Sequence, residues 1–428
     1  MNMLNDQSHG CVGPQVELLQ LALSRTGADI LIDGIFGNNT NTALKQFQLR
    51  RGLRPSGIAG RETWNALMPH LTGYMKHTIK PGKSLYDLAA EYSTSITAIE
   101  TANPNLDPIS PQVGQVITIP LGFPVVPTNV RFTSTVLHLC LRGLQARYPF
   151  LHTASLGSSV MGRDISCITF GSGANHVLYN ASHHANEWIT TPLLMKFIEE
   201  YAHAYSIDSQ LCGFNARALS ELTTLYLVPM VNPDGVDLVT KELTSGEYYD
   251  QALAFSKNYP NVPFPSGWKA NIDGIDLNLQ YPAGWDNAQE IKSGQGITSP
   301  GPRDFVGSAP LVAPESLAMY NFTKSHNLAL TLSYHTQGEV IYWKYLNYEP
   351  INSRKIAQKF GSVSGYTVEE TPYASGFAGY KDWFIEEFDK PGYTVEAGCG
   401  ESPLPLSQFH NIFSKNVEIL TLGLSATI

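Results

Sequence analysis

His184 and Glu187 are the first two residues whose types and spacing point to chemistry. They follow an apolar run, 177–181, that predicts a buried strand, and they precede Thr191-Pro192, where Thr191 is expected to cap a helix. The end of a strand that turns into a helix is where α/β sheets carry their sites. An imidazole and a carboxylate three residues apart on such a turn can bind one cation, and zinc accepts both ligand types.

Two later strand ends supply further ionisable groups. One apolar run, 328–334, ends in His335, and another, 392–395, ends in Glu396. Because parallel strands bring such ends to one edge of a sheet, His184, Glu187 and His335 would form the two-histidine, one-carboxylate set of catalytic zinc sites. Glu396 would then be the general base that takes a proton from water and passes it to the leaving nitrogen.

Each of these residues also has a structural interpretation. The pair His184 and Glu187 fits a helix start in which the glutamate faces the positive end of the helix. His335 could be a hydrogen-bonded residue of the core, and Glu396 could form an ion pair with a lysine such as Lys390.

The elements that must position these residues lie in segment 129–428, which predicts one large domain of alternating strands and helices. The predicted helices cover 132–148, 191–206, 312–325, 352–361 and 407–422. The predicted strands cover 167–170, 177–181, 222–231, 328–334 and 393–395. This alternation predicts an α/β/α domain with a mixed, mostly parallel sheet.

Residues 12–70 contain an internal half-repeat. The motif that begins Asp33-Gly-Ile-Phe-Gly recurs from Ser56, an offset of 56 − 33 = 23 residues. The glycines permit tight turns, and Thr40 and Thr63 are expected to cap short helices. The segment therefore predicts a three-helix domain over 1–72. On Leu19-Gln20, Phe47-Gln48 and Thr63-Trp64, among others, it resembles the peptidoglycan-binding domain type 1.

Residues 75–121 predict a βααβ unit, because strand signals at both ends flank two short helical patterns. The motifs His77-Thr-Ile-Lys-Pro-Gly and Gly114-Gln-Val-Ile-Thr-Ile-Pro make this unit similar to a LysM domain. The resemblance implies binding of N-acetylglucosamine-containing glycans between the turns at 81–85 and 103–109. The proline-rich segment 122–128 is expected to be a short, stiff linker.

Segment 129–428 resembles the zinc metallocarboxypeptidases of the M14 type. The matching motifs are Gly162-Arg163, His184-Ala-Asn-Glu187-Trp188, Asn232-Pro-Asp-Gly235, Trp268-Lys269, Asp276-x-Asn278, Ser333-Tyr-His335 and Thr394-Val-Glu396. The resemblance implies one zinc ion per chain, bound by His184, Glu187 and His335, with Glu396 as the catalytic base.

Further roles come from the same resemblance. Lys269 lies where the family has an arginine that polarises the scissile carbonyl, although lysine lacks the bidentate fork. Asn278 matches a substrate-binding residue. Tyr373 is the best match for the mobile tyrosine that caps the substrate, and its alternative is an ordinary loop tyrosine.

One departure bears on specificity. Leu279 follows Asn278 where the family has the arginine that reads a free C-terminus, which argues against general carboxypeptidase action. Segments 268–282 and 396–405 are similar to the bacterial γ-D-glutamyl-L-diamino acid endopeptidases, which cut peptidoglycan stem peptides before meso-diaminopimelate or lysine. Arg303 and Lys381 are candidates for binding the far end of the diamino acid.

The whole chain of 428 residues carries a net charge of −9, which argues against sequence-independent binding to nucleic acid. It shows neither a membrane-spanning run nor a signal peptide at its first residues. The expected partners are peptidoglycan glycan strands and stem peptides, in the cell wall or spore, with the oligomeric state open. The alternatives are an exopeptidase on free or wall-derived peptides and a catalytically silent wall-binding protein.

Overall fold

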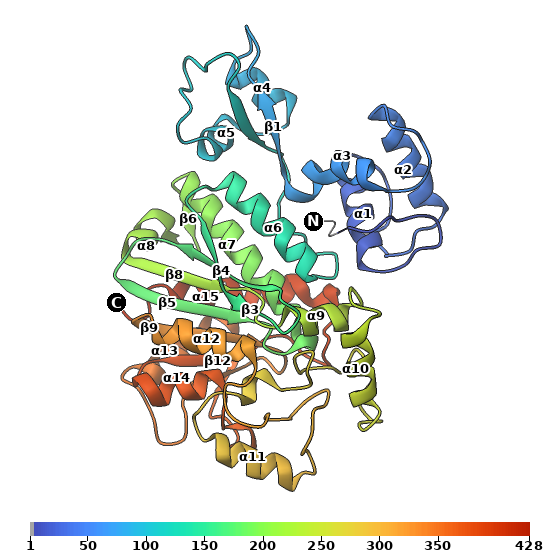
Figure 1. Ribbon diagram of the computed structural model, residues 1–428. Coiled ribbons are helices and arrows are strands. Elements are labelled where there is room, and N and C mark those ends of the chain that lie inside the picture. The colour runs from blue at the N-terminus through green and yellow to red at the C-terminus, as the bar shows by residue number, and fades with distance from the viewer. Residues whose placement is uncertain (1–3) are drawn as a thin grey trace. The chain divides into compact units, whose positions relative to one another are not determined.

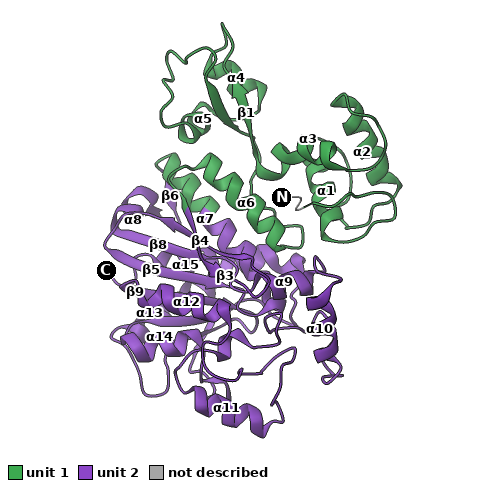
Figure 2. Ribbon diagram, in the orientation of Figure 1, with its two compact units in different colours: residues 1–152, 199–208 green, residues 153–198, 209–428 purple. Residues whose placement is uncertain are grey.

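The computed structural model describes residues 4–428, and the chain folds into two compact units (Figure 2). The first unit holds residues up to 152 together with 199–208, and the second holds 153–198 and 209–428. No helix of the described residues is long and apolar enough to cross a membrane. No disulfide joins the cysteines within them.

The first unit begins with the three predicted helices, α1 (Pro14–Arg25), α2 (Asn38–Arg50) and α3 (Arg61–Thr72). The prediction that Thr40 and Thr63 cap α2 and α3 is wrong, because each threonine lies inside the first turn, after an uncapped glycine. Their hydroxyls instead accept hydrogen bonds from Gln20 and Gln48, both at 3.1 Å. The half-repeat therefore encodes a glutamine that ties each turn to the preceding helix.

The predicted βααβ unit follows in β1 (Tyr74–Thr78), α4 (Leu85–Glu91), α5 (Ile96–Ala102) and β2 (Val116–Pro120). The two strands pair antiparallel. Ser84 caps α4 through a capping box, and Ser95 caps α5, so polar side chains fix both helix starts. Leu88, Ile99 and Ile119 form its core. Helix α6 (Ser134–Arg147) completes the first unit with the end of α7 (Thr190–Ser206).

The second unit is built on an eight-stranded sheet of order β11-β10-β12-β9-β5-β8-β4-β3 (Figure 1). The strands are β3 (His152–Ser158), β4 (Asp164–Phe170), β5 (Asn175–Ala181), β8 (Thr223–Val228), β9 (Leu328–His335), β10 (Val340–Tyr342), β11 (Thr367–Glu369) and β12 (Gly392–Glu396). The neighbours β8, β5, β9 and β12 run parallel, whereas β4 and β10 run antiparallel to their partners β8 and β12. This confirms the predicted mixed, mostly parallel sheet.

Helices cover this sheet, and β9 is buried along nearly its whole length, as a strand covered on both faces must be. The remaining helices of the second unit are α8 (Ala216–Leu222), α9 (Pro233–Thr240), α10 (Glu247–Ser256), α11 (Trp285–Gly294), α12 (Pro314–Lys324), α13 (Ser353–Ser364), α14 (Tyr380–Phe388) and α15 (Phe409–Gly423). A two-stranded ribbon, β6 (Gln210–Leu211) with β7 (Phe214–Asn215), lies outside the main sheet.

Several element boundaries differ from prediction. Strand β8 ends at Val228, not at residue 231, because Asn232 caps α9. Thr191 lies within α7 and does not cap it; its hydroxyl donates to the carbonyl of Pro229 at 2.6 Å. The short strands β10 and β11 were not expected, since three residues are too few to show a period.

Candidate metal centre and catalytic cavity

Three parallel strands bring the predicted site residues to one edge of the sheet. The turn after β5 carries His184 and the short helix η1 (Ala185–Glu187), while β9 ends at His335 and β12 at Glu396. In the register of β9 and β12, Glu396 lies directly beside His335. The carboxyl ends of parallel strands therefore meet as the sequence analysis expected.

His184, Glu187 and His335 form a cluster that fits one metal ion. The Nδ1 atoms of His184 and His335 lie 3.0 and 2.9 Å from the two carboxylate oxygens of Glu187, and 3.2 Å from each other. Zinc bound tetrahedrally at about 2.0–2.1 Å separates its ligand atoms by about 3.3 Å. With one ligand atom taken from each residue, all three atoms lie within 4.8 Å of one another, so the cluster can bind zinc and leave a fourth position open.

Asp276 orients the first of these ligands. Its Oδ1 lies 3.2 Å from Nε2 of His184, and its Oδ2 accepts the backbone N–H of Asp304 at 3.1 Å. This contact fixes the ring and leaves Nδ1 of His184 for the metal. Burial opposes protonation of His184, but the carboxylates of Glu187 and Asp276 outweigh it and raise its pKa to about 9. A metal ion must therefore displace a proton when it binds.

Lys269 lies beside Glu187 of the candidate metal cluster. Its Nζ is 3.0 Å from Oε1 of Glu187, and its carbonyl accepts the N–H of Ala185 at 2.9 Å. Burial lowers the pKa of Lys269, but the charge of Glu187 outweighs that effect and keeps the side chain cationic. The site thus has a fixed positive charge next to the metal position.

Glu396 lines the same cavity as His184 and His335. Burial, followed by the negative charge of Glu187, raises the pKa of Glu396 to about 8, so this carboxyl readily holds a proton. A bound divalent cation would oppose that shift. Within the described residues Lys390 forms no ion pair with Glu396 and donates instead to Asn327 at 2.6 Å.

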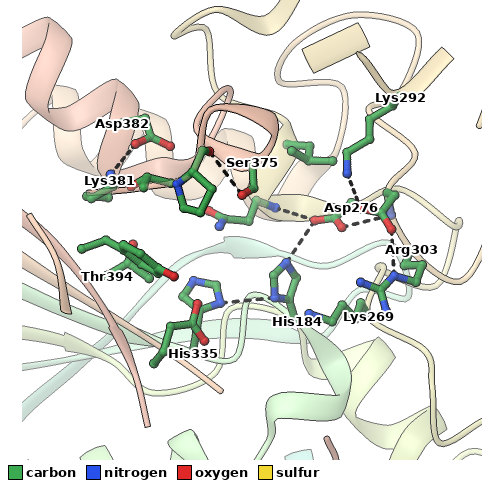
Figure 3. A pocket seen from close by; sticks show the side chains of 17 residues that line it. His184, Lys269, Asp276, Lys292, Arg303, His335, Ser375, Lys381, Asp382 and Thr394 are labelled. Carbon is green, nitrogen blue, oxygen red and sulfur yellow. Dashed lines mark hydrogen bonds and ion pairs between the residues drawn. The ribbon is translucent and has the colours of Figure 1, made fainter. Parts of the chain in front are cut away.

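The cavity has a volume of about 250 Å³ and is mostly polar (Figure 3). It is lined by His184, Lys269, His335 and Glu396 together with Asp276, Asn278, Leu279, Lys292, Arg303, Asp304, Tyr342, Thr371, Pro372, Ser375, Lys381, Asp382 and Thr394. The structure therefore brings Asn278 to the cavity, with its Oδ1 accepting the N–H of Tyr380 at 3.0 Å.

Tyr373, unlike Asn278, does not line the cavity. It begins the short helix η3 (Tyr373–Ser375), is 68% exposed, and packs its ring edge-on against Phe377 at 5.0 Å between centroids. The cavity lining contains its neighbours Pro372 and Ser375, but not Tyr373 itself.

Sequence analysis assigned no role to Asp276, although it lay in a matched motif. Its charge partner, His184, is 92 residues away in the chain. The only sequence signal for Asp276 was its place two positions before Asn278 in the matched motif. Nothing in the spacing of residues linked Asp276 to His184.

Comparison with known proteins places the chain in a family. Residues 137–419 match the zinc carboxypeptidase family, Peptidase_M14, and the chain belongs to it. Residues 12–67 match the putative peptidoglycan-binding domain PG_binding_1, and residues 77–120 match the LysM domain. The protein is therefore a zinc peptidase with peptidoglycan-binding modules, and peptidoglycan is its partner.

Among individual proteins, the chain is 45% identical over 285 residues to gamma-D-glutamyl-L-diamino acid endopeptidase 1 of Lysinibacillus sphaericus, covering 66% of this chain and 70% of that protein. It is 23% identical to carboxypeptidase B of Bos taurus over 57% of each chain. The crystal structure of thrombin activatable fibrinolysis inhibitor shares the fold, with a TM-score of 0.55 and 17% identity over 70% of this chain and 75% of that one.

Proposed function

We propose that this protein hydrolyses the bond between γ-D-Glu and the diamino acid, meso-diaminopimelate or lysine, of peptidoglycan stem peptides. The observation that carries the proposal is the cluster of His184, Glu187 and His335 beside a polar cavity that Glu396 lines together with both histidines. The name of the L. sphaericus relative and the two N-terminal modules support this substrate.

His184, Glu187 and His335 would hold one zinc ion per chain. When bound, zinc supplies a Lewis acid that polarises the scissile carbonyl and makes water a better nucleophile. Glu396 takes the proton from the attacking water and releases it to the leaving nitrogen of the diamino acid. Lys269 places positive charge where the carbonyl oxygen becomes negative in the transition state.

The cavity and the modules have complementary roles. Asn278 on the cavity wall contributes to substrate binding, and Tyr373 moves towards the substrate from its exposed position on η3. The modules, with domain boundaries at 1–72, 75–121 and 129–428 and a linker at 122–128, attach the enzyme to wall glycan. Attachment raises the local enzyme concentration on an insoluble polymer, in the cell wall or the spore.

The test is mass spectrometry of defined muropeptides digested by the wild type and by Glu396→Gln. The wild type should yield products ending in L-Ala-D-Glu. The variant should retain its metal, because Glu396 is not a ligand, and lose at least about 100-fold in rate. Release of single C-terminal residues from simple peptides would favour an exopeptidase. A zinc-loaded protein that cuts no muropeptide would favour a silent wall-binding protein.

A further inference from the structure

Arg303 lines the cavity, and one hydrogen bond fixes its side chain while other donors of its guanidinium group stay available. Its Nε donates to Oδ2 of Asp304 at 2.7 Å, and its side chain is 44% exposed. Lys292 holds the other oxygen of Asp304 at 2.6 Å. Within residues 4–428, the terminal nitrogens of Arg303 make no hydrogen bond. These two nitrogens are a ready fork for a carboxylate.

Lys381, the other cation considered for substrate binding, is held more firmly than Arg303. Its Nζ donates to the carbonyl of Lys344 at 2.8 Å and to Oγ1 of Thr371 at 2.9 Å, and it forms an ion pair with Oδ1 of Asp382 at 2.5 Å. Its side chain is buried, whereas that of Arg303 is 44% exposed. The contacts of Lys381 therefore hold it in the cavity wall, and Arg303 is the more accessible of the two for a carboxylate.

The position of Arg303 indicates which part of the substrate it meets. Figure 3 shows Arg303 and Lys269 on one side of His184, and Thr394 on the other. Glu396 follows Thr394 on β12 and delivers a proton to the leaving nitrogen, so the diamino acid lies on that side. The acyl residue, γ-D-Glu, then lies on the side of Arg303.

The γ-linkage gives this acyl residue an unusual feature, since its α-carboxylate stays free a short aliphatic stem away from the scissile carbonyl. The geometry points to Arg303, held by Asp304 and Lys292, as the subsite that binds this α-carboxylate. This inference rests on the proposed function, and it makes Arg303 a specificity-determining residue on the acyl side. An ordinary α-linked peptide has no carboxylate at that place.

The experiment compares three tripeptides. The first is L-Ala-γ-D-Glu-L-Lys, the second carries an amide at the α-carboxylate of D-Glu, and the third an amide at the carboxylate of lysine. With the wild type, α-amidation of D-Glu should lower kcat/KM about 10- to 100-fold, the effect of losing one charged hydrogen-bonded pair. Arg303→Gln should show a similar loss on the first and third peptides and only about a twofold change on the second.

Two variants accompany this comparison. Arg303→Lys keeps the positive charge but not the two parallel N–H donors, so its kcat/KM on the first peptide should lie between the values for the wild type and for Arg303→Gln. Arg354→Gln removes an exposed arginine outside the cavity and should leave the ratios of kcat/KM among the three peptides unchanged. The inference is overturned if Arg303→Gln lowers kcat/KM equally on the first and second peptides. It is also overturned if the loss in kcat/KM disappears only when the lysine carboxylate is amidated.

A binding measurement separates this inference from the proposed function. Calorimetric titration with L-Ala-D-Glu and with its α-amide should show at least about tenfold tighter binding of the free acid to the wild type, and near-equal binding to Arg303→Gln. Discrimination in binding without hydrolysis of any tripeptide would support the subsite and reject the proposed activity. Hydrolysis without any discrimination would support the activity and overturn the subsite.

Discussion

At the scale of single residues, the site depends on a chain of oriented polar groups. His184 contributes one nitrogen to the metal cluster and the other to Asp276, whose second oxygen accepts from the backbone of Asp304. Asp276 thus connects the loop that carries Arg303 and Asp304 with His184. A change at Asp276 should therefore affect the metal without touching a ligand.

Replacing Asp276 by Asn should weaken zinc binding about 10- to 100-fold, because the neutral amide no longer fixes and polarises the His184 ring. Competition with a metal-binding dye measures the affinity. Asp273→Asn, in the same loop, is the control, since Asp273 is bonded by Gln251 and not by a metal ligand. Equal zinc affinity in the Asp276 and Asp273 variants would show that Asp276 does not support the metal site.

At the scale of elements, the start of α12 supports the loops around the site. Glu315 is fully buried there and accepts the N–H of Val160 at 3.2 Å and the side-chain amide of Asn271 at 3.1 Å. Asn271 in turn accepts the N–H of Ile275 at 3.0 Å. One buried carboxyl therefore connects α12 with two loops, including the one that carries Lys269.

Burial raises the pKa of Glu315 from 4.5 to about 7, so its protonated form favours the folded state. Its contribution to stability is present below about pH 4.5 and is lost as pH rises through 7. Between pH 5 and 8, the wild type should therefore lose up to about 3 kcal/mol relative to Glu315→Gln. Thermal melting of both proteins across this range measures the difference.

The matched control is Glu290→Gln, which changes an exposed glutamate of α11. Its melting temperature should follow that of the wild type at every pH. If the Glu315 variant also runs parallel to the wild type from pH 5 to 8, Glu315 titrates normally and the assigned effect of burial is wrong.

At the scale of the whole molecule, wall attachment and hydrolysis depend on different residues. Two exposed apolar side chains mark the turns expected to form the glycan groove of the LysM domain. Tyr86 directly follows the first turn and is 73% exposed, and Ile109 is the last residue of the second turn and is 93% exposed. Flat apolar groups of this kind are suited to the faces of sugar rings. The residues proposed to act in hydrolysis lie in the other compact unit.

The double variant Tyr86→Ala/Ile109→Ala should lower binding to insoluble peptidoglycan about tenfold or more and leave hydrolysis of soluble muropeptides unchanged. Co-sedimentation and a soluble-substrate assay measure the two effects. Ile351→Ala, at a residue 83% exposed in the second unit, is the control for loss of an exposed apolar side chain. Unchanged sedimentation of the double variant would place glycan binding elsewhere.

Removal of zinc should abolish hydrolysis and leave attachment to the wall intact, the reverse of the double variant. Chelation should abolish hydrolysis and lower the melting temperature of the second unit, because a ligand that binds only the folded state stabilises it. One equivalent of zinc should restore both, while sedimentation with peptidoglycan should continue throughout. Full activity in excess chelator after dialysis would contradict a zinc mechanism.

The sequence by itself determined the large features, because each depends on a strong local pattern. Apolar runs that end in His335 or Glu396 predicted strand ends with ionisable groups, and the sheet confirmed their place at one edge. The half-repeat predicted the three helices, but not the glutamine contacts that replaced the expected threonine caps.

Only the tertiary structure decided which charged side chains are available. Nothing in the sequence distinguished Lys381, which is buried and held by two hydrogen bonds and an ion pair, from Arg303, whose terminal nitrogens are accessible. Nor did it connect Asp276 with His184. The physical reason is that these contacts are made by irregular loops, which have no period to read and whose side chains find their partners only after distant segments have packed together.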